Sequence, residues 1–216
     1  MTPQAIYEIL REANARSACE PFDGHVLTCI FTAAVLENGR GVSFTDALGI
    51  CGSALRGSIE RYFPGAVDWL ATFVGLDVEP VIGEEERCLR ELLWRFRSTP
   101  SPLNSLLTNL LARRATRPNH LWQDLGLANR AELSMLMQRH FAALARRNTQ
   151  DMKWKKFFFR MICRDEGFSI CAAPSCSECS DFDGCFGDES GESHLARMRF
   201  HIEGSAMIPT EAIGSV

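Results

Sequence analysis

Apolar residues along positions 5–165 recur every three or four residues rather than every two. That spacing gathers them on one face of an α-helix, so the pattern predicts a mainly α fold. Gly, Pro and Asn interrupt the pattern and divide it into separate elements. We predict helices over residues 2–16, 23–37, 84–97 and 103–115, two short helices within 43–62, a further segment over 66–74, and a long helix that begins after Asn129 and carries Leu133, Leu136, Met137, Phe141 and Leu144 on its inner face. The helix over 23–37 is apolar nearly all round, so we expect it to be central.

Basic and apolar residues separate by helical angle within residues 152–164. At about 100° per residue, one narrow arc holds Lys153, Lys156, Arg160 and Arg164, and another arc holds Trp154, Phe157, Phe158, Met161 and Ile162. A strand would mix the two classes on both faces, so a helix with one basic stripe is predicted. All three lysines of the chain lie here, at 153, 155 and 156. The stripe is either a contact for an anion or an acidic partner surface, or a solvated helix face.

The helical pattern ends near Gly167, and Gly, Ser, Asp, Cys and Pro dominate to about Gly191. We therefore expect a multi-helix domain at 1–166, an irregular cysteine-rich metal-binding loop at 167–191 and a C-terminal tail at 192–216. The length of 216 residues suits one such domain with an appendage.

Charge and cysteine content narrow the possible partners and the compartment. A formal net charge of -4 gives no general attraction to nucleic acid or to an anionic membrane, so we expect neither as a partner. The longest apolar stretch, 25–36, is shorter than the roughly 20 residues that a membrane span needs, and the N-terminus shows no export signal. Nine cysteines cannot all pair. We expect a reducing cytoplasm, where clustered cysteines bind metal more often than they form disulfides.

Four cysteines form one compact motif of spacing C-x4-C-x2-C-x5-C, at Cys171, Cys176, Cys179 and Cys185. Thiolates are ligands for zinc and for iron–sulfur clusters. Structural zinc sites usually pair two short knuckles that lie a dozen or more residues apart, whereas this motif is one tight loop, which favours an iron–sulfur cluster. A structural zinc-binding interaction module and a small iron–sulfur electron-transfer protein remain the alternatives.

Two segments carry a family resemblance. The run 152–160 (MKWKKFFFR), followed by Cys163, by Glu166-Gly167 and by the cysteine motif, which closes in Cys-Phe-Gly at 185–187, resembles the NifQ family of nitrogen-fixation proteins. The segment 119–127 (NHLWQDLGL) is also similar to that family. The resemblance covers residues 119–187 closely, whereas residues 1–118 match only in their helical character.

The resemblance implies a protein that binds an iron–sulfur cluster with molybdenum and supplies the molybdenum for synthesis of the nitrogenase iron–molybdenum cofactor. It implies Cys171, Cys176, Cys179 and Cys185 as the cluster ligands, molybdate or a molybdenum donor as the source, and the NifEN scaffold and NifH as recipients. The chain shows no nucleophile elbow, phosphate-binding glycine loop or metallohydrolase motif, so we expect a metal carrier and donor rather than an enzyme.

Other residues have more than one interpretation each. Cys163 is an accessory ligand or a buried thiol. His120 is an accessory ligand, a helix cap or a residue packed in the core. His194 and His201 are weaker candidate ligands. The scattered cysteines are expected to be core residues or incidental thiols: Cys19, Cys29, Cys51 and Cys88. Trp122, Trp154 and the run 157–159 are expected to dock the basic helix onto the helical domain.

Overall fold

The computed structural model of the chain describes residues 1–75 and 79–165. These residues form eleven helices and no strand, so the predicted mainly α fold class is confirmed for them. The helices are α1 (Pro3–Asn14), α2 (Pro21–Asn38), α3 (Phe44–Leu48), α4 (Gly52–Tyr62), α5 (Val67–Ala71), α6 (Glu84–Arg95), α7 (Pro102–Ala115), α8 (Leu121–Asp124), α9 (Arg130–His140), α10 (Ala142–Ala145) and α11 (Trp154–Asp165). The predicted cysteine-rich loop at 167–191 and tail at 192–216 lie outside the described residues.

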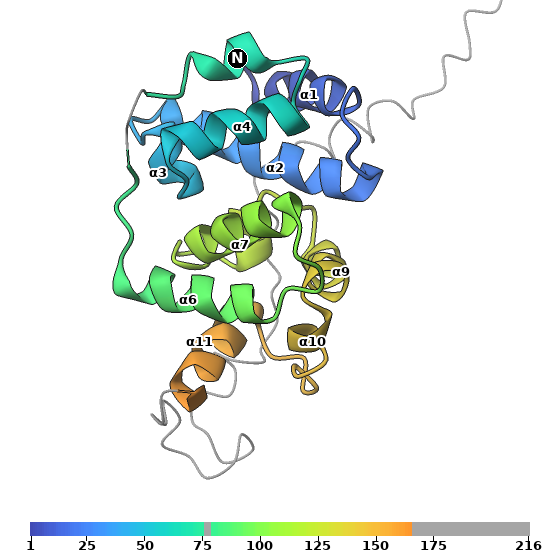
Figure 1. Ribbon diagram of the computed structural model, residues 1–216, viewed down its shortest axis with the longest axis vertical. Coiled ribbons are helices and arrows are strands. Elements are labelled where there is room, and N and C mark those ends of the chain that lie inside the picture. The colour runs from blue at the N-terminus through green and yellow to red at the C-terminus, as the bar shows by residue number, and fades with distance from the viewer. Residues whose placement is uncertain (76–78, 166–216) are drawn as a thin grey trace, which may run out of the picture.

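The helices stack in the order that their contacts define. Helices α1 and α3 pack on α2, α3 also contacts α7, α7 packs on α6, and α6 contacts α11. Figure 1 shows α1 to α4 as the upper part of the molecule, α7 and α6 beneath them, and α11 beyond α6 at the opposite end from α4. Among the described residues, no helix combines the length and the apolar composition that a membrane crossing requires.

Helix α2 is central, as its all-round apolar pattern predicts. Its residues Val26, Leu27, Ile30 and Phe31 are fully buried. Gly24 allows α2 to lie against α1, because a Cβ atom at this position would stand 2.0 Å from Oδ1 of Asn14.

Buried polar contacts join α2 to the C-terminal helices. His140 of α9 places Nε2 2.9 Å from Oδ1 of Asp23 in α2, and both residues are buried. Arg114 of α7, which is also buried, forms an ion pair with Glu37 at the other end of α2. Each pair gives a buried charged group a specific partner, so these contacts fix which faces of the helices meet.

The predicted long helix after Asn129 is wrong in one respect, because it breaks at Phe141. Phe141 has φ -138° and ψ 44°, which ends α9 at His140 and separates it from the short α10. The carbonyl of His140 accepts the N–H of Ser98 at 2.7 Å, and the N–H of Ala142 donates to Oγ of Ser98 at 3.0 Å. Hydrogen bonds to the turn before α7 therefore replace the backbone hydrogen bonds that would continue the helix through Phe141. The predicted inner residues are nevertheless buried: Leu133, Leu136, Met137, Phe141 and Leu144.

The other elements agree with the predicted ranges to within a few residues. The segment over 66–74 contains the shorter α5, and the helix predicted over 84–97 ends at Arg95. The two short helices within 43–62 are α3 and α4, separated by Gly49, whose φ of 67° caps α3 in the left-handed conformation.

Candidate functional site

The candidate metal site follows α11 in the sequence. Helix α11 ends at Asp165, and the first motif cysteine is Cys171. The motif cysteines and the candidate histidines lie outside the described residues: Cys171, Cys176, Cys179, Cys185, His194 and His201. Positions 163 and 164 belong to α11, but the side chains of Cys163 and Arg164 lie outside the described part of the chain. The structure thus describes the helix that precedes the motif and the surfaces beside that helix.

The apolar face of α11 anchors it to the helical domain. Phe158 is fully buried, and Trp154, Phe157 and Met161 are nearly so. The Trp154 ring meets the Phe157 ring edge-on at a centroid distance of 5.9 Å, and its Nε1–H donates to Oγ of Ser134 in α9 at 3.3 Å. The predicted docking role of these aromatic residues is confirmed, except that Phe159 is only partly buried. The chain therefore enters the cysteine motif from a firmly held helix.

Lys155 belongs to the buried side of α11 and not to its basic stripe. Its Nζ lies 2.5 Å from Oδ2 of Asp124 in α8 and also donates to the carbonyl of Arg117. Asn119 donates to the other carboxylate oxygen of Asp124 at 2.9 Å. Burial lowers the pKa of Lys155, and the hydrogen bond and charge of Asp124 oppose that shift. Lys155 thus joins α11 to the segment that includes α8.

The residues of the predicted basic stripe contact different parts of the surface. Helix α11 begins at Trp154, so Lys153 stands just before it, and the carbonyl of Lys153 accepts the N–H of Phe157 at 2.9 Å. Lys156 is exposed, whereas Lys153 and Arg160 are half-buried. Lys153 and Lys156 line one pocket, whereas Arg160 lines another.

The lysine pocket lies between residues 118–123 and the start of α11. Its volume is about 410 Å³, and its lining includes the three lysines together with Asn119, His120 and Trp122. Leu121, Leu133 and Trp154 supply apolar wall. No Asp or Glu stands among the described residues that line it. The described lining therefore combines lysine, amide and imidazole side chains with an apolar wall.

His120 serves as the N-cap of α8. Its backbone N–H donates to Oε1 of Gln123 at 3.1 Å, and the two residues form a reciprocal capping box. The capping interpretation of His120 is therefore confirmed. Its candidacy as an accessory metal ligand stays untested, because the cysteine motif lies outside the described residues.

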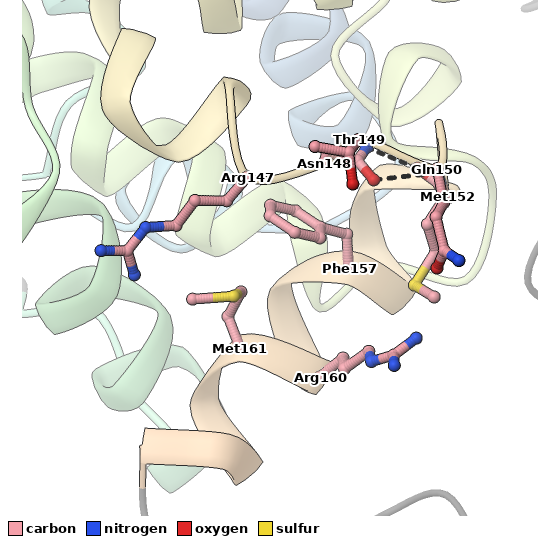
Figure 2. Close-up of a pocket in the computed structure, with 8 residues that line it drawn as sticks. All are labelled: Arg147, Asn148, Thr149, Gln150, Met152, Phe157, Arg160 and Met161. Carbon is pink, nitrogen blue, oxygen red and sulfur yellow. Dashed lines mark hydrogen bonds between the residues drawn. The ribbon is translucent and has the colours of Figure 1, made fainter. Parts of the chain in front are cut away.

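The second pocket lies further along α11, against the turn that follows α10. Its volume is about 580 Å³, and it is lined by Arg147, Met152, Phe157, Arg160 and Met161 among others. Figure 2 shows Arg147 and Arg160 reaching in opposite directions with Phe157 between them. Asn148 holds the turn through two hydrogen bonds to the backbone of Met152, at 2.8 and 2.9 Å. This pocket combines an apolar centre with two basic edges.

Of the four scattered cysteines, the structure places only Cys29 in the core of the described residues. Cys29 is fully buried, and Cys19, Cys51 and Cys88 are partly buried free thiols. Burial, with the nearby charges of Asp23 and Glu20, raises the pKa of Cys19 to about 11, which keeps it a protonated and unreactive thiol. Among the described residues, no group of three or more His, Cys, Asp or Glu side chains is placed to hold a metal ion.

A polar cluster around His25 was not predicted. Its Nδ1 lies 3.0 Å from the hydroxyl of Tyr7 in α1, its Nε2 lies 3.5 Å from Oε2 of Glu132 in α9, and the Cys29 sulfur lies 3.7 Å from Nε2. Burial alone would lower the pKa of His25, but the contacts with Cys29, Glu132 and Tyr7 outweigh it and raise the pKa to about 11. The spacing of His25 and Cys29, four residues apart in one helix, was the only signal for this cluster in the sequence.

Comparison with known proteins identifies the family. A family model described as NifQ matches residues 26–187, which is well over half of the chain. The chain belongs to the NifQ family. It is 41% identical over 174 residues to a protein NifQ homolog of Sinorhizobium fredii, covering 80% of this chain and 75% of that relative. It is 38% identical over 144 residues to protein NifQ of Rhodobacter capsulatus, covering 66% of this chain and 77% of that relative.

Membership of the NifQ family implies a role in nitrogen fixation, in synthesis of the iron–molybdenum cofactor. The resemblance inferred from residues 119–187 is confirmed, and the NifQ match extends it back to residue 26, so it includes most of the helical domain. A shorter match, 47% identical over 81 residues, relates 37% of this chain to 48% of protein NifQ of Klebsiella pneumoniae. No solved structure matches the chain.

Proposed function

We propose that this NifQ-family protein binds an iron–sulfur cluster that carries molybdenum and donates the molybdenum for synthesis of the iron–molybdenum cofactor. The observation that carries the proposal is the four-cysteine motif at 171–185, which falls inside the span that matches the NifQ family model. The anchored helix α11 leads directly to this motif.

The donor set fits this cargo chemically. Four thiolates within one short segment are typical ligands of an iron–sulfur cluster. Molybdate is a hard oxyanion, whereas molybdenum held by sulfide and thiolate is in a soft ligand environment. The cysteines Cys171, Cys176, Cys179 and Cys185 would hold the cluster until its molybdenum is transferred. The protein acts as a carrier, because the sequence has no motif for catalysis of an ordinary reaction.

The proposed recipients are the NifEN scaffold and NifH, and the proposed source is molybdate or a molybdenum donor. These assignments follow from the resemblance to the family. The second pocket, with Phe157 at its centre and Arg147 and Arg160 at its edges, is a surface beside α11 that an acidic recipient would recognise.

The test compares motif cysteines with a cysteine of the helical domain. We expect Cys176→Ala and Cys179→Ala to abolish most of the iron and molybdenum content of protein purified anaerobically, together with its cluster signal in electron paramagnetic resonance. Cys51→Ser is the matched control, because Cys51 is the N-cap of α4 and Ser is a favourable capping residue. Normal iron and molybdenum in the two motif variants would overturn the proposal.

The same preparation separates the alternatives. A colourless, air-stable protein with one zinc ion would replace the proposal with a structural zinc module. An iron–sulfur cluster that cycles reversibly and holds no molybdenum would replace it with electron transfer.

A further inference from the structure

The second pocket has an apolar centre and a basic residue at each edge. Met152, Phe157 and Met161 supply its apolar lining. Figure 2 shows Arg147 and Arg160 reaching away from the Phe157 ring in opposite directions. No carboxylate stands among the described residues that line the pocket. The lining therefore fits an occupant that has an apolar group in the middle and an acidic group on either side.

Arg147 supplies the clearer of the two basic edges. Its guanidinium stacks over the ring of Phe96, 4.3 Å from the ring centroid, and the side chain is exposed and forms no ion pair with a described residue. Stacking occupies the face of the guanidinium and leaves the N–H groups at its edge, which are the groups that bond a carboxylate. Arg160 already has an interaction, but a guanidinium carries five N–H donors and can bond more than one partner.

The rim of the pocket is formed before any occupant arrives. Asn148 makes two hydrogen bonds to the backbone of Met152, and Arg130 donates to the backbone carbonyls of Asp151 and Met152. Arg130 also pairs with the carboxylate of Asp151 at 2.8 Å, which compensates the acidic charge of this turn. Asp151 has a φ of 52°, a conformation that is unfavourable for a non-glycine residue and is held here by these bonds. A rim held in this way needs little ordering when it binds.

The chain itself contains a segment with the complementary pattern. Between the third and fourth motif cysteines, Asp181 and Asp183 stand on either side of Phe182. Residues 167–191 contain five acidic residues and no basic one. An aromatic residue flanked by two carboxylates is the pattern that an apolar pocket with two basic edges fits.

Helix α11 brings this segment within reach of the pocket. Met161 lies four residues before the end of α11 at Asp165, and Phe182 follows that end by 17 residues. A stretch of that length spans up to about 55 Å, which is ample for a return to a pocket on the same helix. The covalent connection also keeps the segment at an effective concentration of about a millimolar, so weak contacts are sufficient for docking.

We propose that Phe182 packs in the second pocket and that Asp181 and Asp183 bond the guanidinium groups of Arg147 and Arg160. The contact fixes the stretch between the third and fourth motif cysteines against α11. Its role in holding the cluster rests on the proposed function, whereas the contact itself needs no cluster. An acidic recipient that recognises the same pocket has to displace this segment, so its docking loosens the hold on the cargo.

The experiment maps the contact by photo-cross-linking in the full chain. The photoreactive residue p-benzoylphenylalanine replaces Phe182, the protein is irradiated, and mass spectrometry identifies the residue that becomes joined to position 182. We expect a cross-link within one molecule to the apolar lining of the pocket, at Met152, Phe157 or Met161.

Charge reversal tests the two basic edges. Arg147→Asp with Arg160→Asp should lower the yield of this cross-link by about fivefold or more, because repulsion replaces attraction on both sides of the pocket. Adding Asp181→Arg and Asp183→Arg to that variant should restore most of the yield, since the opposite charges then face each other again.

The matched control reverses the same amount of charge at a distant place. Arg56 and Arg61 are exposed on α4, at the end of the molecule opposite α11. Arg56→Asp with Arg61→Asp should leave the yield within about twofold, because screening removes long-range charge effects at physiological salt. Thermal unfolding of every variant checks that it is folded.

Several outcomes would overturn the proposal. They are no cross-link, a cross-link outside the pocket or only between two molecules, a yield that charge reversal leaves unchanged, and an equal loss in the α4 control. An unchanged yield together with lost molybdenum delivery in the charge-reversed variant would assign the pocket to the recipient instead.

Metal analysis of the wild-type protein keeps this inference separate from the proposed function. Normal iron and molybdenum without the cross-link would reject the contact and leave the proposed function in place. A charge-dependent cross-link in a chain that holds neither metal would support the contact and reject the proposed function.

Discussion

Lys155 of α11 and Asp124 of α8 form an ion pair that is largely shielded from water, with 2.5 Å between Nζ and Oδ2. Asn119 donates to the same carboxylate, and the carbonyl of Arg117 accepts from the same ammonium group. All the hydrogen-bonding partners come from the segment that leads into and forms α8. The pair therefore fixes the helix that precedes the cysteine motif to the wall of the lysine pocket.

This geometry predicts a large difference between two adjacent lysines. Lys155→Ala should lower the free energy of unfolding by about 3 kcal/mol, because it leaves the buried carboxylate of Asp124 without its cation. Lys156→Ala should change it by less than about 0.5 kcal/mol, because Lys156 is exposed. Chemical denaturation of both variants measures the difference. Equal, small effects would show that the ion pair contributes nothing to stability.

The sequence allowed half of this relationship to be predicted. At about 100° per residue, Lys155 falls roughly 200° from Lys153, on the side of Phe158 and Ile162 rather than on the basic stripe. Helical angle alone thus separates it from the stripe. Its partner was not predictable, because Asp124 lies 31 residues earlier in another helix and local periodicity carries no information on which helices meet.

The prediction of one long helix through Phe141 failed for the same reason. The apolar spacing of Leu136, Phe141 and Leu144 continues through it, but Ser98 takes the backbone bonds of its neighbours. The cysteine motif is the opposite case. Its ligands follow one another within 171–185, so spacing alone predicts a metal site there, and that site stays a prediction because its geometry lies outside the described residues.

His25 predicts a pH dependence of stability. Its pKa is raised from the ordinary 6.5 to about 11, so above about pH 6.5 the folded protein retains a proton that the unfolded chain releases. The contribution of His25 is fully present below pH 6.5 and is lost as the pH rises toward 11. The groups that face the imidazole are Tyr7, Cys29 and Glu132.

The variant His25→Gln isolates this contribution. We expect the difference in free energy of unfolding between wild type and variant to shrink steadily from about pH 6.5 to about pH 9. In this range the unfolded chain has lost the proton that the folded protein keeps, so each rise in pH favours the unfolded state. Denaturation curves at a series of pH values measure that difference. Parallel pH profiles for the two proteins would rule out a raised pKa at His25.

The packing of α11 predicts a contrast between neighbouring phenylalanines. Phe158 is fully buried, whereas Phe159 is partly buried at the edge of the core. Phe158→Ala should lower the free energy of unfolding by about 3–5 kcal/mol through lost burial and a residual cavity, and Phe159→Ala should cost clearly less. Equilibrium unfolding of both variants tests this, and a larger loss for Phe159→Ala would mean that α11 presents a different face to the domain.

The contact between α1 and α2 predicts opposite signs for two glycine substitutions. In Gly24→Ala, the new Cβ would lie 2.0 Å from Oδ1 of Asn14, a buried side chain that cannot move without losing its 2.8 Å hydrogen bond from Nδ2 to the carbonyl of Tyr62. Gly24→Ala should therefore lower the free energy of unfolding by about 1–3 kcal/mol, the penalty of an unpaired buried amide. Gly57 lies within α4 with nothing within 4 Å of its would-be Cβ, so Gly57→Ala should stabilise by about 0.4–1 kcal/mol. The unfolding temperature of Gly24→Ala should therefore lie below the wild-type value and that of Gly57→Ala above it. An unchanged unfolding temperature for Gly24→Ala would mean that α1 can shift away from α2 without breaking the Asn14 hydrogen bond.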